Sequence, residues 1–427
     1  MIKILWGIGT ILILISGIYW TIKLKGVQFN IKNIIKSFSS SNKGISPFKS
    51  LTMALGARIG VGSLAGVALA IYLGGYGTIF WMWIVALVCS SNAFCEVVLG
   101  MIYQENDLNN VCIGGPSYYI KKGLGKHRLA IIYALIIIVS YIIGFLTIQS
   151  NTISVSITNI FNIEPIIIGI IISILSFLAI IGGVKKISTI TSYLVPIMGI
   201  FYIGICFFII VTNINIMGDI LLKIVTDAFN IKAFGFGVIT TLLIGVQRGI
   251  FSNEAGLGTG AIASSVVEYS TPVKQGFVQV SGIYITTLLV GTITALVIMC
   301  SNIDTTKIMD INGIEITTMA FNYHLGIIGD YIVMITIVLF AFSTIVTGYY
   351  YGESSLKFLN KTISNKYILI LKVITCILLL LGSIISSTWL WNIVDLFVVI
   401  MAIINIPVLF LLRSNIMYEY QTYKAKN

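Results

Sequence analysis

The sequence contains few charged residues. Asp, Glu, Lys and Arg make up 10% of its 427 residues, against roughly 25% in soluble globular domains. Hydrophobic residues account for 57% of the chain, and the mean hydropathy is +1.02. This composition excludes a soluble protein and indicates a chain that is largely embedded in a membrane.

Histidine and cysteine are also scarce. The two histidines and six cysteines are too few and too scattered for a metal centre or a disulfide framework. We expect the cysteines to be small packing residues in apolar surroundings. No HExxH or GxSxG pattern occurs, so we expect neither an enzyme nor a bound cofactor.

Long apolar runs are abundant. Runs of about 20 residues, enough to cross a bilayer as a helix, recur along the whole chain, and turn signals separate them. We predict one polytopic domain with eleven spans, near residues 3–23, 49–73, 77–103, 129–150, 164–183, 190–212, 235–266, 274–301, 326–352, 367–386 and 388–412.

The basic residues predict the orientation of these spans. With the N-terminus outside, the cytoplasmic loops hold 19 Lys and Arg and the outer segments hold 4. This bias follows the positive-inside rule and places the C-terminal tail in the cytoplasm. Residues 215–231 are predicted to form an amphipathic helix on the outer surface, and residues 105–128 an interfacial loop.

Two predicted spans have glycine-rich, polar interiors, at residues 56–66 and 248–260. An unpaired backbone group in hydrocarbon costs several kcal/mol, so such stretches survive only where they are shielded or line a wet cavity. A helix broken there exposes free N–H and C=O groups that can bind a zwitterion and a cation. The alternative is close helix packing, which Gly62 and Gly66 would also permit.

The spacing of these two spans favours a transporter. The second interrupted span follows the first by five, which divides the remaining ten spans into two sets of five. Because five is odd, the two sets have inverted topology, and breaks at corresponding positions of two inverted halves are typical of transporter binding sites.

Four stretches carry a family resemblance, namely residues 46–83, 245–276, 339–353 and 391–407. Through them the chain resembles the alanine or glycine:cation symporter family of bacteria and archaea, which shares the LeuT fold. The resemblance implies an all-α prokaryotic plasma-membrane protein with a five-plus-five inverted repeat after one extra helix. Its expected parts are the extra helix with a cytoplasmic loop (1–48), the first repeat (49–212), an outer connection (213–234), the second repeat (235–412) and the tail (413–427).

The resemblance also implies a substrate site between the two breaks. The N–H groups at the start of the outer half of the first broken span would hold the substrate carboxylate, with Ser63 as the N-cap. Residues of the second break and one glutamine would complete the pocket. The expected substrate-binding residues are Val61, Gly62, Ser63, Gln149, Phe251, Ser252, Asn253 and Gly256.

A sodium site is implied next to it. Sodium prefers hard oxygen ligands, and the family pattern assigns the carbonyls of Gly56 and Ile59 and the hydroxyls of Ser343 and Thr344. The alternative for the two hydroxyls is that they bond only to their own helix, as intramembrane hydroxyls commonly do.

The chain departs from the family pattern at three places. Gly-Thr-Gly-Asn is replaced by residues 60–63, Gly-Val-Gly-Ser, and Arg58 stands where a threonine is usual. Gly348 aligns with a tryptophan of the pocket wall, so we expect a wider pocket that admits substrates larger than alanine. These departures put the number of coupling ions in doubt.

Charged residues inside spans usually mark function. We expect Arg58 either to pair with Glu96 or Glu254 or to replace a coupling ion, and Arg248 to belong to an outer gate. The sequence thus predicts a carrier that imports a small neutral amino acid with sodium by alternating access, without a protein partner. The alternatives are a cation-independent or proton-coupled carrier, a channel, and a membrane-embedded enzyme.

Overall fold

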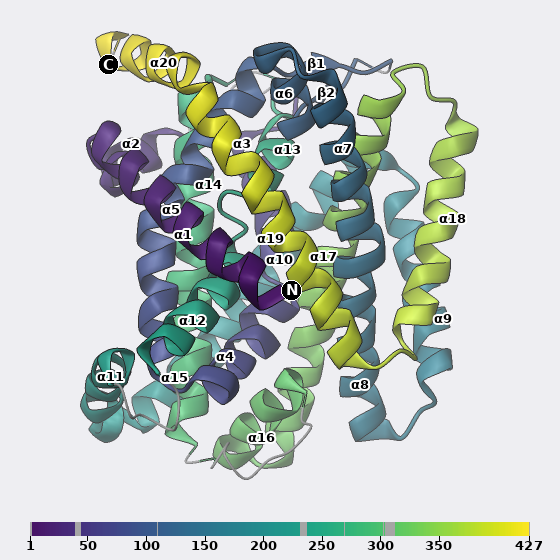
Figure 1. Cartoon of the computed structure of the whole chain (residues 1–427). Coiled ribbons are helices and arrows are strands. Elements are labelled where there is room, and N and C mark those ends of the chain that lie inside the picture. Colours follow the sequence, from purple (N-terminus) through teal and green to yellow (C-terminus); the bar gives the residue numbers. More distant parts are fainter. Residues whose placement is uncertain are drawn as a thin grey trace.

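A computed structural model describes residues 2–38, 44–108, 110–230, 237–268, 270–301, 303 and 312–426. These residues form a nearly all-helical molecule in which long helices run side by side (Figure 1). Its one hairpin in the described ranges pairs β1 (Glu105–Asn106) with β2 (Cys112–Ile113).

Eight helical stretches are long and apolar enough to cross a membrane. They are α1 (Ile2–Lys23), α5 (Gly77–Ile102), α7 and α8 (His127–Ile138, Leu146–Phe161), α10 (Gly183–Thr212), α14 and α15 (Pro272–Ile283, Thr292–Cys300), α17 (Ile327–Leu359), α18 (Asn365–Gly382) and α19 (Ser387–Leu411). Two of these stretches consist of two α-helices joined by a π-helical segment. Val139–Phe145 joins α7 to α8, and Tyr284–Gly291 joins α14 to α15.

The other three predicted spans are shorter or broken. The helix α3 (Pro47–Arg58) continues through the π-helical segment Gly62–Gly66 into α4 (Val67–Gly74), and the axis bends by 55° between them. The span α12 (Val238–Asn253) is separated from α13 (Thr259–Ser264), and α9 (Pro165–Ile180) has only 16 residues. By length and composition the described helices therefore give eight spans, or nine with the bent pair, where the sequence predicted eleven.

Local sequence explains where the helices begin. Proline is the first helical residue of α3, α9 and α14, where its missing N–H has no helical partner to lose. The Ser46 side chain accepts from the Lys49 N–H at the start of α3, and Thr271 accepts from the Lys274 N–H at the start of α14. Such caps satisfy donors that the first turn leaves free.

Connecting helices lie at two opposite ends of the molecule (Figure 1). At one end are α11 (Ile214–Phe229) and α16 (Gly313–Leu325). At the other are α2 (Ile31–Lys36), the hairpin, α6 (Pro116–Leu124) and the C-terminal α20 (Arg413–Lys426). The structure thus separates the segments predicted outside from those predicted inside, and it confirms the helix predicted at 215–231. The predicted interfacial loop at 105–128 instead contains the hairpin and α6.

The two broken helices meet each other. Residues of the first break contact Phe251 of α12, and Arg58 contacts Gly260 of α13. In contrast, α1 exposes a regular row of isoleucines on its outer side, as expected for a lipid-facing helix; they are Ile4, Ile8, Ile11, Ile15, Ile18 and Ile22.

Candidate functional site

The first break frees backbone groups, as predicted. The helix α3 stops at Arg58 because Ile59 leaves helical geometry, with φ −84° and ψ 73°. The N–H of Val61 then donates to the amide oxygen of Gln149 on α8, at 3.1 Å. The structure therefore brings together two residues of the predicted substrate site. The glutamine oxygen accepts the N–H hydrogen bond that was expected to go to a substrate carboxylate.

Gly62 allows the two breaks to approach closely. A methyl group at Gly62 would lie 2.7 Å from Cδ1 of Phe251, which is closer than atoms pack, so the ring rests on the bare backbone. Phe251 stacks on Phe145 at 5.3 Å between ring centroids and also contacts Trp391 at 4.9 Å. The two predicted site residues Gly62 and Phe251 thus form one packed contact.

Ser63 does not have its predicted role. It was expected to cap the outer half of the first broken span, but Val61 stands at that position and receives no side-chain cap. The Ser63 hydroxyl donates instead to the Arg58 carbonyl at 3.5 Å. The correction follows from helix geometry, because the π-helical segment begins at Gly62 and leaves Ser63 one residue inside it.

The second break is built from three left-handed positions at alternate residues. Glu254, Gly256 and Gly258 have φ of 55°, 86° and 75°, a region that glycine enters freely and other residues rarely. The strained Glu254 is held by its side chain, which accepts hydrogen bonds from Tyr141 at 2.8 Å and from Thr259 at 2.7 Å. Glu254 therefore stabilises the break through these two hydrogen bonds.

Other predicted site residues at this break form hydrogen bonds with the backbone or with neighbouring side chains. The Gly256 carbonyl accepts from the Asn405 amide at 2.9 Å, and the Asn253 amide oxygen accepts from the Ala255 N–H at 2.9 Å. Ser252 accepts from the Thr287 hydroxyl at 3.2 Å. Thr287 was missed from the sequence because its span carries no break or charge to single it out.

The predicted ion-site residues of α3 and α17 meet. The Gly56 carbonyl accepts from Ser343 at 3.1 Å and from Thr344 at 2.9 Å. Both hydroxyls also bond to the Phe340 carbonyl of their own helix, so they do not bond to their own helix alone. Thr347, one turn further, is fully buried and points its hydroxyl at the same glycine. Three hydroxyl oxygens and one backbone carbonyl oxygen therefore lie close together near the end of α3.

Gly348 does not widen a pocket. A methyl group there would lie 2.7 Å from Cδ1 of Leu146 and 3.0 Å from Cδ1 of Tyr141. The space expected from a missing tryptophan is therefore filled by side chains of the neighbouring span, and the expectation of a wider pocket is wrong in this conformation.

Arg58 lies away from the ion site. A methyl group at Gly260 would lie 2.8 Å from Nη2 of Arg58 and 3.1 Å from Oε1 of Glu96, and one at Gly282 would lie 3.0 Å from Nη1. Arg58 thus faces α5, α13 and α14, with Glu96 as a near neighbour. Its three side-chain nitrogens have no hydrogen-bond partner among the described residues.

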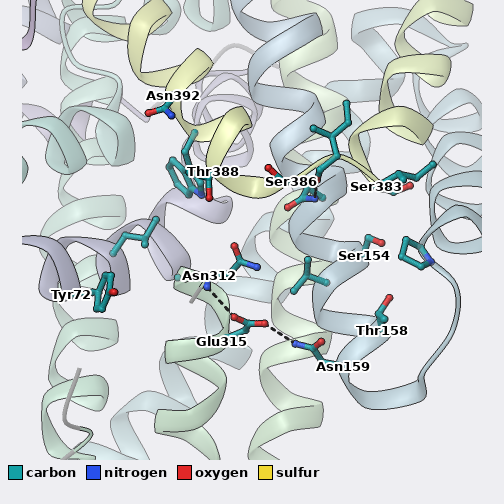
Figure 2. A pocket seen from close by; sticks show the side chains of 18 of the residues that line it. Tyr72, Ser154, Thr158, Asn159, Asn312, Glu315, Ser383, Ser386, Thr388 and Asn392 are labelled. Carbon is teal, nitrogen blue, oxygen red and sulfur yellow. Dashed lines mark hydrogen bonds between the residues drawn. The ribbon is translucent and has the colours of Figure 1, made fainter. Parts of the chain in front are cut away.

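Arg248 closes the floor of a large cavity. Its guanidinium forms an ion pair with Asp395 at 2.8 Å and lies 4.7 Å from the Trp391 ring centre. The cavity, about 770 Å³, is lined with polar side chains from α8, α16 and the start of α19, including Glu315, which bonds to Asn312 and Asn159 (Figure 2). Arg248 and Trp391 line this cavity, and the Trp391 ring contacts Phe251 of the second break.

The sodium:alanine symporter family matches this chain over residues 1–427. The chain belongs to this family. Among its curated relatives, a probable sodium/glutamine symporter of Bacillus subtilis is 36% identical, over 98% of this chain and 88% of the relative. A sodium/alanine symporter of Methanococcus maripaludis is 34% identical, over 98% and 94%. The family consists of symporters, so the expectation of a membrane carrier rather than an enzyme is confirmed.

Solved structures show the same fold at low sequence identity. A sodium-coupled sialic acid symporter superposes with a TM-score of 0.55 at 12% identity, covering 92% of this chain and 82% of its own. The transporter MhsT, solved with L-phenylalanine, gives 0.53 at 12%, covering 88% and 100%. This member of the sodium:alanine symporter family thus has the predicted LeuT-like fold.

Proposed function

We propose that this protein imports a small neutral amino acid, alanine or glycine, together with sodium, by alternating access. The symporters named for alanine and for glutamine among its relatives support an amino acid substrate. We further propose residues 49–212 and 235–412 as the two inverted repeats. The N-terminus then lies outside and the C-terminus in the cytoplasm, with the chain in a prokaryotic plasma membrane, sodium as the coupling ion and no cofactor.

One observation carries the sodium proposal. At the point where α3 ends, the Gly56 carbonyl is met by the hydroxyls of Ser343 and Thr344. Hard oxygen ligands from a helix end and from a neighbouring helix suit a cation such as sodium. We propose that the ion enters between these groups and that the Ile59 carbonyl joins them.

The first break supplies the site for a carboxylate. The outer half of the span presents its N-terminus beside Val61, where the positive end of the helix dipole favours an anion. In this conformation the Gln149 amide oxygen accepts from that N–H at 3.1 Å. A bound amino acid would replace the amide oxygen with its carboxylate, while Ser252 and Asn253 provide oxygens for its ammonium group.

The alternative in which Arg58 replaces the coupling ion receives no support from the contacts. The ion-site carbonyl of Gly56 faces α17, whereas the guanidinium of Arg58 lies against Gly260 and Gly282. A fixed charge on that side of α3 leaves the hydroxyls of Ser343 and Thr344 available to sodium.

Uptake into proteoliposomes tests the proposal. We expect labelled alanine to accumulate when sodium is higher outside, and uptake to saturate with substrate, which a channel would not show. Thr344→Ala should raise the sodium concentration for half-maximal uptake on the order of tenfold, since one lost oxygen contact contributes about 1 kcal/mol.

The matched control is Thr375→Ala on α18. This threonine is equally buried, and among the described residues its hydroxyl bonds to the Leu371 carbonyl of its own helix alone, so its loss should leave the sodium dependence unchanged. Uptake that is the same with and without sodium would reject coupling to that ion.

A further inference from the structure

Glu96 is a fully buried carboxylate with one satisfied oxygen. Its Oε2 accepts from the Gly258 N–H at 2.8 Å, at the start of α13, and from the Asn405 amide at 3.4 Å. Its Oε1 has no hydrogen-bond partner among the described residues. In a buried ionised carboxylate both oxygens normally accept hydrogen bonds. The oxygen without a donor therefore indicates a bound proton or another cation.

The charges around Glu96 do not balance. Arg58 is the cation of this cluster: its Nη2 and Oε1 of Glu96 lie 2.8 Å and 3.1 Å from the position that a methyl group on Gly260 would take. Glu254 is a second carboxylate, and it interacts electrostatically with Glu96. Glu254 accepts a hydroxyl hydrogen bond on each oxygen, which suits the ionised form. Two ionised carboxylates beside one guanidinium would leave one negative charge in the membrane interior, at a cost of several kcal/mol.

Other titratable groups near Glu96 do not supply the missing donor. Tyr119 of α6 donates to Asn405, and Tyr133 of α7 donates to the Leu257 carbonyl. The Tyr351 hydroxyl of α17 bonds to none of the described residues. Among the residues that the structure describes, the titratable groups that interact electrostatically with Glu96 are Arg58, Cys95, Tyr119, Tyr133, Glu254 and Tyr351.

We propose that Glu96 is a proton-binding site, with the proton on Oε1 in this conformation. The added proton balances the cluster, because ionised Glu254 and Arg58 then remain as one charge of each sign. Sodium suits this position poorly, since the guanidinium beside Gly260 would repel it. The carrier thus has a second cation site, chemically distinct from the oxygens at Gly56.

A route for the proton lies between α3 and α14. Arg58 borders Gly282, and one turn earlier on α14 the Gln279 amide donates to the Ser50 hydroxyl at 3.4 Å. A further turn earlier, Gln275 is fully buried and both polar atoms of its amide lack partners among the described residues. These side chains form a polar row that leads from Arg58 to the start of α14, and water that enters such a row can carry a proton.

Infrared spectroscopy of the purified carrier in lipid nanodiscs tests the proton directly. At neutral pH we expect the carbonyl band of one protonated carboxylic acid per chain, and its loss in Glu96→Gln. The control Glu164→Gln removes an exposed carboxyl and should leave the band unchanged. If Glu96→Gln does not fold, Glu96→Asp decides, because it should shift the frequency of the band. A band that neither Glu96 variant changes, or no such band in the folded protein, overturns the proposal.

The infrared test does not depend on sodium-coupled transport; only the use of the proton in the transport cycle rests on that proposal. For that use, the rate of alanine uptake in proteoliposomes should vary with pH in the natural sequence and in Glu164→Gln, and much less in Glu96→Gln or Glu96→Asp. An unchanged pH profile in both Glu96 variants would remove the proton from the cycle. Uptake that ignores sodium would reject the proposed function and leave the infrared result standing.

Discussion

The pair formed by Arg248 and Asp395 should control access from the cavity to the breaks. In Asp395→Asn the 2.8 Å ion pair is lost and Arg248, about 6% exposed, loses its charge partner. Breaking a buried pair by removing one partner costs about 3–5 kcal/mol. Part of that is retained, because Trp391 lies 4.7 Å from the guanidinium and a cation–π contact contributes roughly 0.5–2 kcal/mol.

The cavity further reduces the free-energy cost of breaking the pair, because water in this cavity of about 770 Å³ can reach Arg248. We therefore expect the closed gate to lose about 1.5–3 kcal/mol relative to the open one, which makes opening roughly 10- to 150-fold more frequent. The assay is the labelling rate of a cysteine introduced by Ser252→Cys, behind the gate, with a thiol reagent that does not cross membranes. Labelling of the parent protein measures the contribution of the natural cysteines.

The control is Asp330→Asn, because Asp330 lies outside the gate and accepts from Asn322 at 2.8 Å. It should leave labelling at the rate of the parent with Ser252→Cys. Equal labelling in Asp395→Asn and Asp330→Asn would show that the pair does not hold the gate closed, and would refute this account of the cavity floor.

Three further substitutions test the packing of the site. Gly62→Ala should weaken substrate binding by about 1–3 kcal/mol, because the new methyl group displaces Phe251; the control Gly218→Ala has open space around it, and equal binding in both variants would contradict the contact. Tyr141→Phe should lower the stability of the purified carrier by about 1.5–3 kcal/mol, since the hydrogen bond from Tyr141 to the Glu254 carboxylate is lost; a melting temperature no lower than that of Tyr331→Phe, at an exposed tyrosine, would argue against it. Gly348→Ala should destabilise the protein by about 1–3 kcal/mol through its contacts with Leu146 and Tyr141, and a variant that melts like the parent would restore the wider pocket.

The sequence predicted what depends on local composition. Both breaks were found because glycine and polar residues at mid-span conflict with a helix in lipid, and the helix at 214–229 was found from its amphipathic period. Of the spans that fall short, α9 is apolar but has only 16 residues, and α12 and α13 are separated by the second break.

Side-chain partners could not be predicted in the same way. Ser63 was expected to cap a helix, yet the π-helical segment begins at Gly62 and places the N-cap at Val61, two residues earlier. Asp395 and Arg248 both lie within predicted spans, but their separation of 147 residues along the chain hid the pair. Gly348 shows the same limit, because the side chain that fills its space comes from another span.

The closed gate and the occupied carboxylate site are linked through one ring. Phe251 rests on Gly62 and contacts Trp391, and Trp391 in turn lies under Arg248. One residue before Gly62, the Val61 N–H is held by Gln149. A substrate that reaches this N–H from the cavity must first displace Arg248, Trp391 and Phe251 and then replace the Gln149 oxygen. Substrate binding and gate movement therefore use the same contacts, so a change at Gly62 should alter both.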